Sequence, residues 1–138
     1  MVGDLAKKLG LKPGQTVCLI AAPAASARLV RREAPPGIRF VRSAAGRKLD
    51  HVFLWPSEVR GLGLKLSRIQ RDLAPDGSVW VVMPKKALAP ARGVHFTWEE
   101  MQAEALKSDF VDNKIATIDQ QNYGTRFVIR RERRPKAD

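Results

Sequence analysis

The stretch VCLIAA, residues 17–22, decides how the rest of the chain is interpreted. It is a short and almost continuous apolar run that follows Pro13-Gly14 and ends at Pro23. An apolar run of this length between turn residues is typical of a strand buried on both faces of a parallel sheet. The sequence therefore predicts a central strand at residues 17–22, with helices on both sides of its sheet.

Strand and helix patterns alternate over the remaining residues. One helix is predicted at 24–33, and Ser57 is expected to cap a second helix that runs to residue 73. The pair Thr97 and Glu100 has the spacing of a capping box, which opens a third helix that ends near residue 107. Five further strands are predicted at residues 38–42, 49–55, 78–83, 114–119 and 125–131.

This alternation predicts an α/β fold with one six-stranded, mostly parallel sheet, because parallel neighbours need crossover connections. The expected strand order is 2-1-3-4-6-5, and the last two strands form an antiparallel hairpin. Gly124 lies in the predicted connection of that hairpin, where it is expected to adopt a positive φ. The 138 residues fit one domain, predicted at 1–131, followed by a basic tail at 132–138 that frays.

Composition narrows the classes of function. The net charge of +11, from 25 basic and 14 acidic residues, favours an anionic partner such as a nucleic acid or an acidic protein. No run is long and apolar enough to span a bilayer, and the first twelve residues lack a secretory signal, so a cytoplasmic location is expected. The single cysteine, Cys18, predicts a buried thiol, and His51 and His95 are too few for a metal site, so no metal is expected.

Three short patterns occur in the order found in class I methyltransferases. They are LKPG at residues 11–14, LDHV at 49–52 and LAPDG at 73–77. The chain resembles that family, and the resemblance implies a three-layer, Rossmann-like fold of truncated size. In the family, the first strand runs into a glycine-rich loop that holds S-adenosylmethionine, whereas residues 21–26 here read AAPAAS. The ribose-binding acid expected after the second strand is also absent, since Val41-Arg42-Ser43 stands there. Binding of S-adenosylmethionine is therefore not expected, and no other cofactor is predicted.

A narrower resemblance covers nearly the whole chain. The chain is similar to a bacterial family of short proteins with this methyltransferase-like fold, a domain of unknown function. The matching stretches lie at residues 5–14, 79–87, 111–115 and 124–127. The chain departs from the family pattern at Met83, where a tryptophan is usual, and at Asn122-Tyr123, which replaces a Trp-Ser pair. The resemblance brings no activity with it.

Ligands in open α/β sheets bind outside the carboxyl ends of the strands. The residues expected to bind a ligand at that edge are Lys85, Lys86, Asp119, Tyr123 and Trp55. The two lysines suit a phosphate or carboxylate, although a solvated basic loop explains them equally well. Asp119 more often caps a turn than acts as a base. Residues 112–114 precede a predicted strand and are expected to form a turn at the opposite edge.

Three functions remain open. The first is a noncatalytic methyltransferase-like domain. The second is a module that binds nucleic acid or another polyanion, with candidate contacts at Lys7, Lys8, Arg31, Arg32, Arg130, Arg131, Arg133 and Arg134. The third is an enzyme that acts on a small anionic ligand at Lys85 and Lys86. No Ser-His-Asp arrangement or phosphate-binding loop is present to name a catalytic residue.

Overall fold

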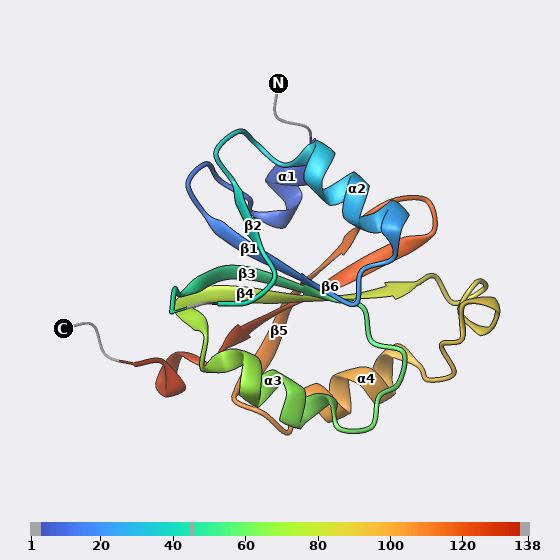
Figure 1. Cartoon of the computed structure of the whole chain (residues 1–138). Coiled ribbons are helices and arrows are strands. Elements are labelled where there is room, and N and C mark those ends of the chain that lie inside the picture. The colour runs from blue at the N-terminus through green and yellow to red at the C-terminus, as the bar shows by residue number, and fades with distance from the viewer. Residues whose placement is uncertain (1–3, 45, 136–138) are drawn as a thin grey trace.

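A computed structural model describes residues 4–44 and 46–135 of the chain. Its centre is one six-stranded sheet with the order β2-β1-β3-β4-β6-β5 (Figure 1). The first four strands in this order are mutually parallel, whereas β6 is antiparallel to both of its neighbours. The strands are β1 (Thr16–Ile20), β2 (Arg39–Val41), β3 (Leu49–Leu54), β4 (Leu73–Pro84), β5 (Phe110–Thr117) and β6 (Asn122–Ile129). The predicted α/β class and strand order are confirmed.

Helices cover both faces of the sheet, so the molecule has three layers (Figure 1). Helices α1 (Asp4–Leu9) and α2 (Ala24–Glu33) lie on one face, and α3 (Leu62–Gln70) and α4 (Trp98–Ala105) lie on the other. Two short 3-10 helices, η1 (Pro90–Arg92) and η2 (Arg131–Arg133), follow β4 and β6. None of the helices in the described part of the chain is long and apolar enough to cross a membrane.

Strand β4 divides the core between these two layers, because successive side chains of a strand point to opposite faces. Val79, Val81 and Met83 pack on the side of α3 and α4. Trp80 and Val82 pack on the side of α1 and α2. The first part of the predicted tail is described by the structure, and it begins within η2, which follows β6. Its last three residues, 136–138, lie outside the described residues.

Two predicted boundaries are wrong in an informative way. The helix expected from Ser57 begins only at Leu62, because Gly61 stands before it in a left-handed conformation with φ 77°. Residues 112–114 do not form a turn; they lie inside β5, which starts at Phe110. The pairing of β5 with β6 shifts between Asp112 and Lys114, and Gln102 of α4 donates to both carboxylate oxygens of Asp112 at 3.1 and 3.2 Å. The capping box at Thr97 and Glu100 is confirmed.

Gly124 has a different role from the one predicted. It lies inside β6, its φ is not positive, and it pairs with Val82 on one side and Ala116 on the other. A Cβ atom at this position would lie 2.9 Å from Cε3 of Trp80 and 3.2 Å from Cδ1 of Ile118. The glycine is therefore required by the close approach of the Trp80 ring and not by a turn.

Replacing Gly124 with alanine should destabilise the domain. The added methyl group has to displace the fully buried Trp80 ring, and overpacking of this kind costs about 1–3 kcal/mol. Urea denaturation of Gly124→Ala and the parent chain measures this cost. Ile115→Ala on the neighbouring strand is the matched control, because Ile115 is 56% exposed and its loss should change stability by less than about 0.5 kcal/mol. Equal stability of Gly124→Ala and the parent would contradict the steric role.

Candidate functional site

The carboxyl ends of the parallel strands meet the start of β6 at one edge of the sheet. Ile20 of β1 pairs with Leu54 of β3, and Leu54 pairs with Val81 of β4. Pro84 at the end of β4 pairs with Asn122 at the start of β6. The loops after β1, β3 and β4 therefore share this edge, where α/β folds place their ligands.

The loop between β1 and α2 keeps a bend that normally needs glycine. Ala21 has φ 60°, the only positive φ of a non-glycine residue in the described part of the chain. Pro23 then stands at the N-cap of α2 and makes no side-chain capping bond, while its carbonyl accepts from the N–H of Ala27 at 2.9 Å. The side chains of Ala21, Pro23 and Ala24 are exposed, so three side chains stand where a ligand would approach the backbone.

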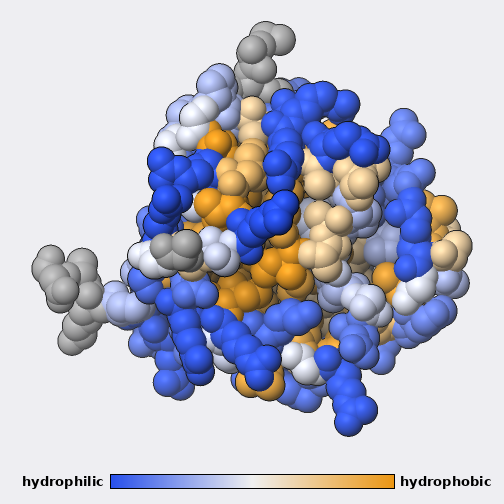
Figure 2. All heavy atoms as spheres, viewed as in Figure 1, coloured by the Kyte–Doolittle hydropathy of each residue, from blue (hydrophilic) through white to orange (hydrophobic). Residues whose placement is uncertain are grey.

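Two small hollows of about 200 Å³ each lie beside β1 and the loop that follows it. One lies beside β1 and β2, with Cys18, Ile20 and Arg42 in its lining. The other lies between Ala21, Trp55 and Leu62. Figure 2 shows hydrophobic residues between hydrophilic ones in the middle of the view. Ligand pockets measure roughly 300–1,000 Å³, so each hollow is small for a cofactor.

A larger cavity, of about 510 Å³, lies at the same edge on the α4 side. It is bounded by the end of β4, the start of β6, the segment after β4 and the first turn of α4. We call it the edge pocket, and its lining residues are Met83, Pro84, Lys86, Ala89, Pro90, Val94, His95, Phe96, Thr97, Trp98, Glu99 and Tyr123.

The structure brings two of the five predicted ligand residues together. Lys86 and Tyr123 both line the edge pocket. Lys85 does not line it; its backbone N–H donates to the carbonyl of Gln121 at 2.8 Å. Trp55 lines the hollow beside Ala21, and its buried Nε1 has no hydrogen-bond partner among the described residues. The five residues therefore do not form one site.

Asp119 closes the turn between β5 and β6. Its Oδ1 accepts from the backbone N–H groups of Gln121 and Asn122, both at 2.8 Å. The side-chain amide of Asn122 donates to the same carboxylate at 3.1 Å. This is the structural role that sequence reasoning weighed beside the catalytic one, and it leaves the carboxylate occupied within its own turn.

Sequence reasoning missed most of the residues that line the edge pocket. Phe96, Trp98 and Glu99 come from the segment that leads into α4, and nothing in their spacing points to β4. Nε1 of Trp98 donates to Oγ1 of Thr125 in β6 at 2.8 Å, which holds the ring against the pocket. The one available signal was the capping box, which fixes where α4 begins.

Tyr123 is a partly buried residue of the pocket wall and carries a polar hydroxyl group. Burial, and then the nearby charge of Glu99, raise the pKa of its hydroxyl, so the group stays protonated at neutral pH. Its only hydrogen-bond partner among the described residues is the thioether of Met83, with Oη and Sδ 3.9 Å apart. A thioether is a weak acceptor, so the hydroxyl can still donate to a ligand.

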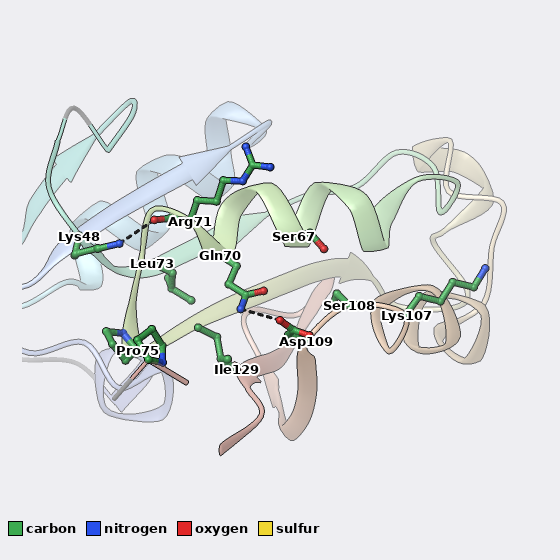
Figure 3. A pocket seen from close by; sticks show the side chains of 11 residues that line it. Lys48, Ser67, Gln70, Arg71, Leu73, Pro75, Lys107, Ser108, Asp109 and Ile129 are labelled. Carbon is green, nitrogen blue, oxygen red and sulfur yellow. Dashed lines mark hydrogen bonds between the residues drawn. The ribbon is translucent and has the colours of Figure 1, made fainter. Parts of the chain in front are cut away.

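A second cavity lies at the opposite edge of the sheet and is basic in character. It measures about 610 Å³ and is bounded by α3, the start of β4, the segment before β5 and, after β6, Pro135. Its cations are Lys48, Arg71 and Lys107, against the single carboxylate of Asp109. Figure 3 shows Gln70 and Asp109 joined at its centre, while the Arg71 and Lys107 side chains reach outward. We call this cavity the basic hollow.

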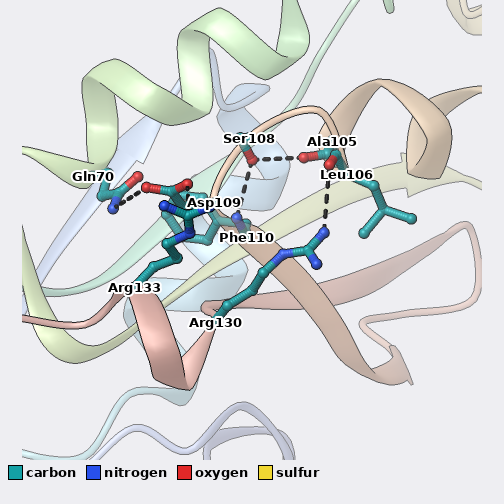
Figure 4. A network of polar contacts seen from close by, with 8 residues as sticks. All are labelled: Gln70, Ala105, Leu106, Ser108, Asp109, Phe110, Arg130 and Arg133. Atoms are coloured by element: carbon teal, nitrogen blue, oxygen red, sulfur yellow. Dashed lines mark hydrogen bonds and ion pairs between the residues drawn. The ribbon is translucent and has the colours of Figure 1, made fainter.

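The segment after β6 adds arginines beside the basic hollow (Figure 4). Arg133 lies 3.9 Å from Asp109, and Arg130 donates to the carbonyl of Leu106 at 3.5 Å. Four of the predicted polyanion contacts lie on the opposite face of the sheet, in the layer of α1 and α2. Lys7 and Lys8 are in α1, and Arg31 and Arg32 are in α2. The guanidinium of Arg31 stands 5.2 Å from the centre of the Phe40 ring. The eight predicted contacts therefore belong to two separate basic surfaces.

Comparisons with known proteins identify the fold. No family model matches the chain, and no curated protein sequence matches it. Among solved structures, the N-methyltransferase NodS from Bradyrhizobium japonicum WM9 is similar with a TM-score of 0.55 and 12% identity, over 91% of this chain and 92% of that one. A fibrillarin pre-rRNA processing protein from Methanococcus jannaschii has a TM-score of 0.53 and 11% identity, over 86% and 67%.

A third similar structure contains a cofactor. LepI in complex with S-adenosylmethionine matches with a TM-score of 0.52 and 15% identity, over 91% of this chain but only 39% of LepI. These likenesses show that the chain has a class I methyltransferase-like, Rossmann-type fold. The narrower resemblance to a family of short bacterial proteins stays a prediction.

His51 is a buried structural residue of β3 and lies away from the edge pocket. Its Nδ1 lies 2.7 Å from Oγ of Ser78, and its Nε2 lies 3.0 Å from Oε1 of Gln15. Burial, together with the positive charge of Arg126, lowers the pKa of this imidazole from 6.5 to about 4. The folded protein therefore holds His51 neutral at pH values where the unfolded chain is protonated.

This pKa shift makes stability depend on pH. Between about pH 6.5 and 4 the unfolded chain binds a proton that the folded chain does not, so stability falls with pH across that window, by up to roughly 3 kcal/mol. Urea denaturation at several pH values measures the slope. We expect His51→Gln to flatten it, because the amide keeps polar atoms for Ser78 and Gln15 but does not titrate. His95→Gln, at an exposed position, is the control and should leave the slope unchanged; equal slopes for all three proteins would contradict the assignment.

Proposed function

We propose that this chain is a noncatalytic methyltransferase-like domain, which keeps the fold and does not use S-adenosylmethionine. The observation that carries the proposal is the loop between β1 and α2. The backbone bends at Ala21, with φ 60°, and enters α2 at Pro23. Residues with side chains therefore stand where the family has a glycine-rich loop.

These side chains hinder a cofactor in two ways. A bound cofactor in this fold approaches the backbone of the loop, and each alanine Cβ occupies part of that space. Pro23 has no N–H, so it removes one donor at the start of α2, where anionic and polar groups are normally held. The residues present do not fit a cofactor that depends on close backbone contact.

The ribose end of such a site is also unsuited to S-adenosylmethionine. The first residue after β2 is Arg42, a cation at the position where a carboxylate would accept from ribose hydroxyls. Arg42 also lines the hollow of about 200 Å³ beside β1, which offers little room for an adenosine group. The loop and the ribose position support the same proposal independently.

A thermal-shift measurement tests the proposal. A ligand at about 100 times its Kd adds about 2.7 kcal/mol of stability, which raises Tm by about 10 °C in a domain of this size. With millimolar S-adenosylmethionine we expect a Tm change below about 1 °C. ATP at the same concentration separates a specific effect from a general response to adenine nucleotides. A saturable rise of several degrees with S-adenosylmethionine, confirmed by calorimetry, would overturn the proposal.

A second candidate function is binding of nucleic acid through the basic hollow. The observation that favours it is the folded segment after β6: Arg133 lies 3.9 Å from Asp109 of this hollow, and Arg131, in the same 3-10 helix, is exposed. Lys48 and Arg71 are exposed as well, and the only ion pairs among the described residues leave both of them out. Unpaired cations beside one another are what a phosphate backbone requires.

The salt dependence of DNA binding distinguishes the two basic surfaces. Each neutralised phosphate contributes about 0.9 to the slope of log K against log salt concentration. We expect a Lys48→Gln, Arg71→Gln, Arg131→Gln variant to reduce this slope by about 2–3 for a fluorescent DNA duplex. The matched control removes the same charge from the other layer, as Lys7→Gln, Lys8→Gln, Arg32→Gln, and should change the slope by less than about 1. Equal effects of both variants, or no binding by the parent chain, would exclude this function.

A further inference from the structure

The edge pocket has the lining of a small-molecule site. Met83, Val94 and Phe96 are buried at its base, and the rings of Trp98 and Tyr123 form half-buried walls. Its volume of about 510 Å³ lies within the range of roughly 300–1,000 Å³ that ligand pockets occupy. A thioether and three aromatic rings around one space favour a flat ring, which can stack on the rings and contact sulfur at its edge.

Hydrogen bonds fix the wall formed by the segment after β4. The N–H of Lys85 donates to the carbonyl of Gln121 at 2.8 Å, and the guanidinium of Arg92 donates to the side chain of the same Gln121. The N–H of Val94 donates to the carbonyl of Ala89 at 2.9 Å and closes the segment on itself. The wall is therefore tied to the turn before β6 without any ligand, and binding does not have to order it first.

The mouth of the pocket carries one charge of each sign. Lys86 and Glu99 both line it and both are exposed, and neither belongs to an ion pair in the described part of the chain. The first turn of α4 is not free to bind an anion, since Thr97 and Glu100 cap it reciprocally. A purely anionic ligand would meet Glu99 as well as Lys86, and a purely cationic one would meet Lys86. A ligand with a carboxylate and an ammonium group suits both residues.

We propose that the edge pocket binds a small aromatic α-amino acid, with its ring between Trp98 and Tyr123, its carboxylate at Lys86 and its ammonium at Glu99. The hydroxyl of Tyr123 is an additional donor at the wall, because Met83 occupies it only weakly. This assignment concerns binding and includes no chemical step. It goes beyond the proposed function and does not depend on it, since the pocket lies on the far side of the edge from the loop at Ala21.

Three related probes separate the contributions of ring, carboxylate and ammonium. L-Phenylalanine carries both charges, 3-phenylpropanoate lacks the ammonium group, and phenethylamine lacks the carboxylate. Isothermal titration calorimetry at low salt should give L-phenylalanine the highest affinity of the three. Lys86→Ala should weaken L-phenylalanine and 3-phenylpropanoate by about three- to tenfold, with phenethylamine not weakened. Glu99→Gln should weaken L-phenylalanine and phenethylamine by a similar factor, with 3-phenylpropanoate not weakened.

Lys85→Ala is the matched control. It removes the same charge from the neighbouring residue, whose side chain does not line the pocket. It should change all three affinities by less than about twofold. The thermal stability of each variant shows whether it is folded, and Tyr123→Phe provides a variant in the wall that keeps its shape. Absence of L-phenylalanine binding at millimolar concentration overturns the proposal. So does binding that Lys86→Ala and Glu99→Gln leave unchanged, or that Lys85→Ala weakens as much as Lys86→Ala does.

Discussion

The fold depends on how the indole ring of Trp80 is enclosed at the middle of the sheet. The ring is fully buried, lies parallel to the ring of Phe53 in β3 with centres 6.4 Å apart, and donates its N–H to the carbonyl of Leu9 in α1 at 3.3 Å. On its other side it approaches Gly124 of β6 so closely that no side chain fits there. One residue therefore joins the first helix, the parallel part of the sheet and the antiparallel part. Because buried polar atoms need partners, the bond to Leu9 satisfies the indole N–H and ties the end of α1 to β4.

The position of the candidate site follows from the same strand. Since Trp80 points toward α1 and α2, Met83 points toward α3 and α4 and reaches the edge of the sheet facing that layer. Its register partner there is Tyr123 of β6. The antiparallel strand thus brings a side chain to the end of β4 that a purely parallel sheet would not place there. The space between this pair of strands and α4 measures about 510 Å³, whereas the two hollows beside β1 and the loop after it measure about 200 Å³ each.

Local patterns predicted the six strands and the helices α2, α3 and α4, but not the short helix α1. Long-range contacts decided the features that the local patterns could not predict. The run at residues 17–22 and the capping box at Thr97 depend on neighbours in sequence, so the strand β1 and the start of α4 could be predicted. Val59 and Leu62 have helical spacing, yet Gly61 breaks the backbone between them, which spacing alone does not reveal. Gly124 looked like a turn residue because its partner, Trp80, is 44 positions away. The edge pocket was visible only in part for the same reason: Lys86 and Tyr123 lie near strand ends, whereas Trp98 is held beside them by its hydrogen bond to Thr125, 27 positions along the chain.

Under the proposed function, no ligand has to approach the backbone of the loop at Ala21. Alanine and proline restrict the unfolded chain more than glycine does, and each such replacement stabilises a protein by about 0.4–1 kcal/mol where the conformation allows it. Pro23 and Ala24 have backbone conformations that suit them, as N-cap and first turn of α2. Ala21 does not, because a left-handed conformation costs a residue with a Cβ roughly 1 kcal/mol, yet the chain still bends there. The bend is imposed by the geometry that carries β1 into α2, which is needed whether or not a cofactor is bound. A glycine-rich loop in this fold therefore has two separate tasks, to bend the chain and to admit the cofactor. The bend is retained here, and under the proposed function the second task is absent.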